Sequence, residues 1–159
     1  MAESPPSLGT DPGINAGKLR AVIEITRFDK PIGTFLLLAP TLWGVVLANQ
    51  GYPPWKLLCL FVAGAIVMRS AGCVANDLAD RHLDGHVERT RLRPLVSGAL
   101  SVSEALFLLV GLLLIALGLV ALTNPLTITL SIAGLALALV YPLMKRVTHL
   151  PQIVLGLAF

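Results

Sequence analysis

The sequence predicts an all-helical bundle that crosses a membrane several times, with four complete spans and the start of a fifth. Of the 159 residues, 55% are apolar and only 13% are charged, and the mean hydropathy is +0.81. Soluble proteins carry about a quarter charged residues. The apolar residues also gather in runs close to the roughly 20 residues that cross a bilayer core of about 30 Å. These two observations indicate a membrane protein.

The first element is a polar tail. Residues 1–17 are rich in proline, glycine and serine and contain no apolar run. Such a composition is typical of a disordered segment, because it offers too little apolar surface to offset the entropy of ordering. We therefore predict a disordered cytoplasmic tail over residues 1–18 and a transmembrane domain over residues 19–159.

Four apolar runs predict the spans. They cover residues 32–48, 55–74, 105–122 and 125–140. A fifth run begins near Pro151 and reaches Phe159 after too few residues to cross a bilayer. We expect either an amino-terminal fragment of a larger bundle, incomplete at its carboxyl end, or a last segment that is completed by something outside this sequence.

The connection between the second and third runs is long for a plain loop, which is unusual unless the loop is functional. We expect the second helix to continue past the membrane edge and to end before Gly85, a residue type that favours helix termination. The third helix should begin after Ser101, because the order Ser101-Val102-Ser103-Glu104 is a capping-box pattern.

Basic residues indicate the orientation of the spans. Lys56 falls on one side of the predicted membrane, and the other eleven of the twelve basic residues fall on the opposite side. Because Lys and Arg are retained on the cytoplasmic side, the amino terminus and the connection after the second run should be cytoplasmic. The basic residues interleave with carboxylates, so we expect no nucleic-acid partner.

Three carboxylates in that connection predict a metal site. Asp77, Asp80 and Asp84 lie within about 60° on one helical face. Three anions there repel each other and require a counter-charge. Oxygen-only ligands favour a hard cation, and Mg²⁺ commonly bridges carboxylates to substrate phosphates. We predict Mg²⁺ and a diphosphate substrate; the alternative is a solvated acidic helix end.

Basic and phenolic side chains near this stripe suit a diphosphate. Arg89 and Arg93 follow it in sequence, and guanidinium groups bind phosphate oxygens in a bidentate manner. Tyr141 and Lys145 share a helical face and could engage phosphates or an acceptor. Arg27, before the first span, is a further candidate anion contact. A positive cytoplasmic loop is the alternative, and it suffices to explain any single arginine.

These residues resemble the motifs of the UbiA-type membrane prenyltransferases, and most closely the 4-hydroxybenzoate polyprenyltransferase branch. The resemblance covers about residues 19–159. The residues that carry it are Asn76-Asp77-x-x-Asp80-x-x-x-Asp84, Arg89-Thr90-x-x-Arg93-Pro94-Leu95 and Tyr141-x-x-x-Lys145-Arg146. Residues 27–34 point to the same branch.

The resemblance implies a fold of about nine helices in a bacterial inner membrane, with Mg²⁺ holding a polyprenyl diphosphate between two Asp-rich motifs. The second motif belongs to the latter half of such a fold, beyond this chain. The implied reaction transfers the polyprenyl group to the ring of 4-hydroxybenzoate in ubiquinone biosynthesis. The implied site comprises Mg²⁺ ligands Asp77, Asp80 and Asp84 with Asn76, phosphate contacts Arg89, Arg93, Lys145 and Arg146, and Tyr141 near the substrates.

Three other interpretations remain. A truncated product could fold in part and be inactive. A non-catalytic membrane subunit or cation transporter would place carboxylates near the bilayer midplane, but these lie at its predicted edge beside arginines that repel cations. A CDP-alcohol phosphatidyltransferase requires a different first spacing and additional aspartates, which the segment from Asp80 to Arg89 does not provide.

Overall fold

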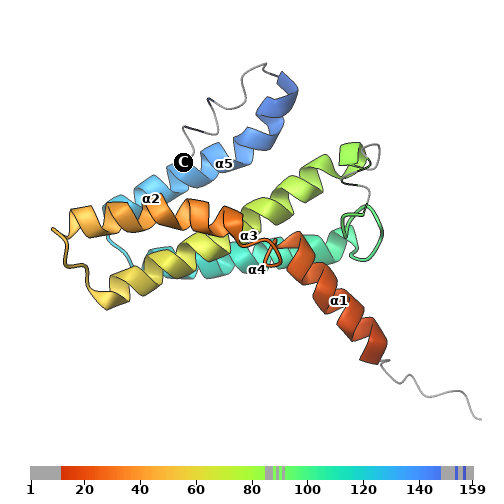
Figure 1. The fold of residues 1–159 in the computed structure, drawn as a ribbon. Coiled ribbons are helices and arrows are strands. Elements are labelled where there is room, and N and C mark those ends of the chain that lie inside the picture. Colours follow the sequence, from red (N-terminus) through yellow and green to blue (C-terminus); the bar gives the residue numbers. More distant parts are fainter. Residues whose placement is uncertain are drawn as a thin grey trace, which may run out of the picture.

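The computed structural model describes residues 12–84, 88, 90, 92–147, 153 and 156, and the side chains of these residues except 12–15, 82–84 and 139–147. The described part of the chain is all-helical (Figure 1). Its helices are α1 (Pro12–Ile25), α2 (Ile32–Ala48), α3 (Trp55–Asp84), α4 (Val102–Ala121) and α5 (Pro125–Val147).

Helix α3 is the centre of the bundle. It contacts each of the other four helices, most extensively α4 and α2. Figure 1 shows α2, α3 and α4 running beside one another, while α1 projects away from the end of the bundle. Every other helix is therefore placed by its packing on α3.

The length of α3 confirms the prediction that the second helix outlasts its apolar run. The run was expected to end at residue 74, and the helix continues to Asp84, for 30 residues in all. At 1.5 Å per residue this is about 45 Å, against a hydrocarbon core of about 30 Å. The Asp stripe thus occupies the last turns of α3. Gly85, the predicted terminator, lies outside the described residues.

Two helical segments are long and apolar enough to cross a membrane, Trp55–Arg81 and Val102–Ala121. The other two predicted spans correspond to the shorter apolar helices Ile32–Ala48 and Pro125–Ala138. All four predicted runs are therefore helical, and two of them reach spanning length within the described residues.

Helix α1 corrects the prediction of a disordered tail through residue 18. Its first seven residues lie in that predicted tail, and residues 1–11 lie outside the described part. Pro12 is compatible with the first turn of a helix, where its missing N–H is not needed. Further along, Ala21 and Ile25 are buried in one cluster with Val74 and Leu78 of α3. This tertiary packing favours a helix that local composition does not indicate.

The start of α4 confirms the predicted capping box. Ser101 Oγ accepts a hydrogen bond from the Glu104 backbone N at 3.2 Å, and Glu104 Oε2 accepts one from the Ser101 backbone N at 2.9 Å. Glu104 Oε1 also pairs with Lys18 Nζ at 2.6 Å. The same carboxylate therefore caps α4 and connects it to α1.

Candidate functional site

The candidate site is centred on Asp77 of α3, whose side chain is only 3% exposed. Arg27 Nη2 donates to both of its carboxylate oxygens at 3.2 Å. Arg93 Nη1 donates to Oδ1 at 3.1 Å. Three segments that are distant in sequence thus meet at one carboxylate, which both arginines share.

Arg27 reaches this carboxylate from a strained turn. Its φ is +61°, in the left-handed region that non-glycine residues seldom adopt. The backbone N–H groups of Phe28 and Arg27 donate to the carbonyls of Ile23 and Glu24 at 3.1 and 3.2 Å, which ends α1 in a Schellman-like turn. Glycine is usual at this position of such a turn. Backbone strain at a charged, inward-facing residue suggests a functional constraint.

Arg93 is positioned by the folded segment that precedes α4. Its carbonyl accepts hydrogen bonds from the backbone N–H groups of Val96 and Ser97, each at 2.9 Å, and the Leu100 N–H donates to the carbonyl of Pro94 at 3.0 Å. Leu100 is buried in the same apolar cluster as Val74 and Leu78 of α3. This packing holds the segment against α3 and directs Arg93 to Asp77.

The cluster of Arg27, Asp77 and Arg93 has a net charge of +1. The side chains of Arg27 and Arg93 are 20% and 21% exposed, so their charges are only partly screened by water. These three side chains together carry two positive charges and one negative charge. Such an arrangement attracts an anion, and guanidinium geometry matches a phosphate group.

The other predicted site residues on α3 are Asn76, Asp80 and Asp84. Asn76 and Asp80 are half-buried and, being four residues apart, share a helical face. Asp84 is the last residue of α3, and its side chain lies outside the described part. The predicted ligands on these last turns thus consist of aspartate carboxylates and the Asn76 amide, a set compatible with Mg²⁺.

The described residues do not by themselves form a complete metal site. Among the described residues, no group of three or more His, Cys, Asp or Glu side chains could hold a metal ion. Arg89 lies outside the described residues. The remaining predicted contacts lie near the end of α5, where only the backbone of these residues is described: Tyr141, Lys145 and Arg146. Their side-chain positions relative to Asp77 stay predictions.

Arg69 is a charged residue that was not among the predicted site residues. It lies within α3, about 12 Å before Asp77 along the helix. Its Nη1 donates to Cys73 Sγ at 2.9 Å. Its guanidinium packs against Gly33 of α2, where an added Cβ would lie 2.9 Å from Nε and 3.0 Å from Cζ. A charge inside an apolar run is the signal that could have identified it as functional.

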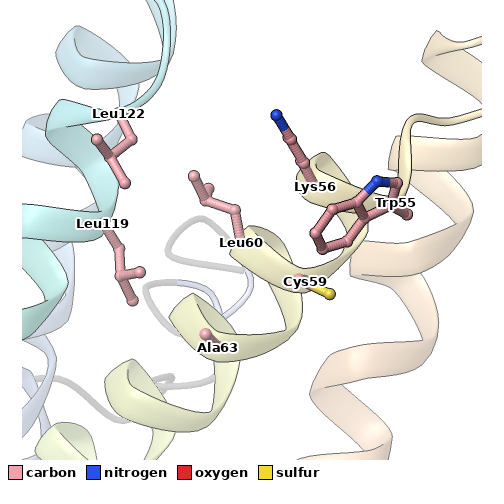
Figure 2. A pocket seen from close by; sticks show the side chains of 7 residues that line it. All are labelled: Trp55, Lys56, Cys59, Leu60, Ala63, Leu119 and Leu122. Atoms are coloured by element: carbon pink, nitrogen blue, oxygen red, sulfur yellow. The ribbon is translucent and has the colours of Figure 1, made fainter.

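A cavity of about 500 Å³ lies at the opposite end of α3 from Asp77 (Figure 2). It is lined by Trp55, Lys56, Cys59, Leu60, Ala63, Leu119 and Leu122. In Figure 2, Leu60 faces the two leucines of the α4 end across the cavity. Trp55 begins α3 about 33 Å before Asp77 along the helix axis, so this apolar cavity is separate from the charged cluster.

Comparison with known proteins agrees with the resemblance in sequence. Residues 37–159 match the UbiA prenyltransferase family. The chain is similar to proteins named 4-hydroxybenzoate octaprenyltransferase. In Coxiella burnetii (strain CbuK_Q154) the identity is 58% over 137 residues, which is 86% of this chain and 48% of the relative. In Pectobacterium atrosepticum it is 59% over 147 residues, and in Vibrio parahaemolyticus 54% over 146 residues, each 92% of this chain and 51% of the relative.

The chain thus spans about half the length of these curated relatives. No solved structure matches it. The family match covers most of the chain, including Asp77, Arg93 and the other α3 residues of the candidate site. The chain belongs to the UbiA prenyltransferase family.

Proposed function

We propose that the chain contributes the first diphosphate-binding half of a 4-hydroxybenzoate polyprenyltransferase of ubiquinone biosynthesis. The observation that carries this proposal is the cationic cluster of Arg27, Asp77 and Arg93 beside Asn76 and Asp80. The family and the names of the relatives support it. Its substrates are a polyprenyl diphosphate and 4-hydroxybenzoate, and its setting is the lipid bilayer.

In this proposal Mg²⁺ would bind along the stripe of Asp77, Asp80 and Asp84 with Asn76, and it would supply positive charge that neutralises the diphosphate. Arg27 and Arg93 bind phosphate oxygens. When the allylic carbon–oxygen bond ionises, negative charge grows on the leaving oxygen, and cationic groups already in place stabilise it. The ring carbon ortho to the phenol then attacks the allylic cation, and loss of the ring proton restores aromaticity. The site must exclude water, which would otherwise capture the cation.

The remaining predicted residues are assigned by the resemblance. Arg89, Lys145 and Arg146 contact phosphate, and Tyr141 lies near the substrates. Arg146 is included among the catalytic residues because a guanidinium at the leaving group stabilises the developing charge. All of them lie on the side of the membrane that carries most of the basic residues.

Arg69 offers a contact for the acceptor. A charged residue within an apolar span is costly and is usually retained for function. 4-Hydroxybenzoate carries a carboxylate at the end of the ring opposite the phenol. Arg69 lies about 12 Å before Asp77 along α3, near the middle of this helix. We assign it to the acceptor carboxylate.

We also propose the membrane arrangement predicted from the sequence. The four apolar helices span a bacterial inner membrane, with the amino terminus and the Asp-rich end of α3 on the cytoplasmic side. The interleaved arginines and carboxylates there do not favour a cation pathway, because Arg27 and Arg93 already pair with Asp77.

A reconstituted assay tests the function. Membranes carry this chain, the carboxyl-terminal half of the Pectobacterium relative, or both, and receive 4-hydroxybenzoate, octaprenyl diphosphate and Mg²⁺. We expect prenylated product only when both halves are present, because the resemblance places a second Asp-rich motif in the other half. Asp80→Ala should abolish it.

The full-length Pectobacterium relative serves as the positive control in the same membranes. Product from the relative together with none from the paired halves, both halves being present in the membrane in equal amount, would contradict the proposal. Unchanged turnover in Asp80→Ala would remove the α3 stripe from the mechanism.

A further inference from the structure

We infer that Asp77 is a positioning residue whose carboxylate holds Arg27 and Arg93 together for the diphosphate, while the metal is bound by the later residues of the stripe. This inference rests on the proposed function and assigns different roles to the aspartates of the stripe: one positions the arginines, and the later ones bind the metal. Asp77 then acts through the two arginines, whereas Asp80 acts on Mg²⁺ directly.

The first argument for the inference is that the carboxylate oxygens of Asp77 already accept hydrogen bonds. Both carboxylate oxygens already accept from guanidinium nitrogens, Oδ1 from Arg93 and Arg27 and Oδ2 from Arg27. A Mg²⁺ ion bound to either oxygen at about 2.1 Å would lie close to both guanidinium groups. Three cations with four positive charges in all would then share a single carboxylate in a site with little solvent screening, which is unfavourable.

Burial carries the second step. Asp77 is 3% exposed, whereas Asp80, one turn later, is half-buried. Mg²⁺ gives up its water reluctantly and usually keeps several water ligands when a protein binds it. A carboxylate enclosed by two guanidinium groups offers little space for a hydrated ion. Asp80, closer to the end of α3, is the better placed ligand.

The third argument is that the two arginines come from different segments of the chain and meet at Asp77. Arg27 comes from the turn after α1, and Arg93 comes from the segment before α4. Their side chains carry like charges, and the shared Oδ1 atom brings one nitrogen of each within 3.2 Å of the same point. Without the carboxylate they would repel each other. Asp77 therefore sets the spacing of the two groups that meet the diphosphate.

The test compares Asp77→Asn with Asp80→Asn, the same isosteric change one helical turn apart. The protein is this chain paired with the carboxyl-terminal half of the Pectobacterium relative, in lipid nanodiscs. Two readouts are independent of turnover: calorimetric binding of inorganic pyrophosphate at saturating Mg²⁺, and binding of Mn²⁺ followed by electron paramagnetic resonance.

We expect Asp77→Asn to weaken pyrophosphate binding by about tenfold or more, since charge-assisted contacts of both arginines are disturbed, and to leave Mn²⁺ affinity within about twofold. Asp80→Asn should weaken Mn²⁺ binding by about tenfold or more, because a metal ligand is lost. Equal loss of Mn²⁺ affinity in the two variants, or wild-type pyrophosphate binding by Asp77→Asn, would overturn the inference.

A second variant covers the case in which Asp77→Asn does not reach the membrane in folded form. Asp77→Glu keeps the charge and should retain wild-type Mn²⁺ affinity with a smaller loss of pyrophosphate binding. Loss of Mn²⁺ affinity in Asp77→Glu would contradict the assignment. If the wild-type pair binds neither pyrophosphate nor Mn²⁺, the proposed function itself fails. If the wild-type pair binds both ligands, but Asp77→Asn does not combine weaker pyrophosphate binding with unchanged Mn²⁺ affinity, only the inference fails.

Discussion

At the residue scale, Arg27 combines an unfavourable backbone with a favourable charge contact. Its φ of +61° is close to that of Gln50, whose φ of +53° ends α2 in the same way. In both turns the residue occupies the place where glycine is usual. Of these two described residues, only Arg27 has a buried ionic partner, Asp77. Comparing the two positions therefore separates the energetic cost of the left-handed backbone from the contribution of the Arg27 side chain to stability.

Replacing each of these residues with glycine makes that separation measurable. Gln50→Gly should raise the free energy of unfolding slightly, by about 0.5 kcal/mol, because relief of left-handed strain outweighs the added freedom of the unfolded chain. Arg27→Gly should lower it by about 1–3 kcal/mol, because buried Asp77 loses one of its two arginine partners. Chemical unfolding in detergent micelles measures both. Shifts of the same sign would show that the ionic contact contributes little.

At the element scale, the first turn of α4 shows how a local motif fixes a helix that also serves the site. The capping box formed by Ser101 and Glu104 starts α4 just after the segment that carries Arg93. Leu100 and Ala105, on either side of the cap, are buried with Val74 of α3. The start of α4 is thus fixed both by local hydrogen bonds and by packing.

The variant Ser101→Ala removes the cap and should lower the free energy of unfolding by about 1 kcal/mol. Hydrogen exchange should also quicken at the backbone N–H of Glu104, which loses its acceptor. Ser103→Ala is the matched control, because Ser103 is exposed in the same turn and does not accept from the helix backbone in the described structure. A cost for Ser103→Ala equal to that for Ser101→Ala would indicate a general effect of serine removal.

The elements also show which features a sequence can reveal. The extension of α3 and the cap of α4 were predicted because both depend on patterns within a few residues. Helix α1 was missed because its burial depends on Val74 and Leu78, far away in sequence. At the site, the residue types were predicted and their pairing was not. Arg27 and Asp77 are 50 positions apart, and only the packing of α1 on α3 brings them into contact.

At the scale of the whole molecule, the ion pairs that join distant segments of the described chain lie at one end of the bundle. Lys18 meets Glu104 there, and Arg27 and Arg93 meet Asp77. Lys56 lies at the opposite end, beside Trp55 at the cavity. This segregation agrees with the asymmetry seen in the sequence. Because Lys and Arg are retained in the cytoplasm, the end with Asp77 should face it, and the turn between α2 and α3 should face the periplasm.

Site-directed labelling tests this orientation with one cysteine at each end. In a background of Cys59→Ala and Cys73→Ala, we introduce Tyr52→Cys, which lies in the turn between α2 and α3, or Ser97→Cys, which lies before α4; both positions are exposed. A membrane-impermeant maleimide added to spheroplasts should label Tyr52→Cys at once. It should label Ser97→Cys only after the membrane is permeabilised, because the charged end cannot cross the bilayer without a large desolvation cost. The reverse pattern would place the Asp77 cluster outside the cytoplasm, away from the side on which the basic residues are retained.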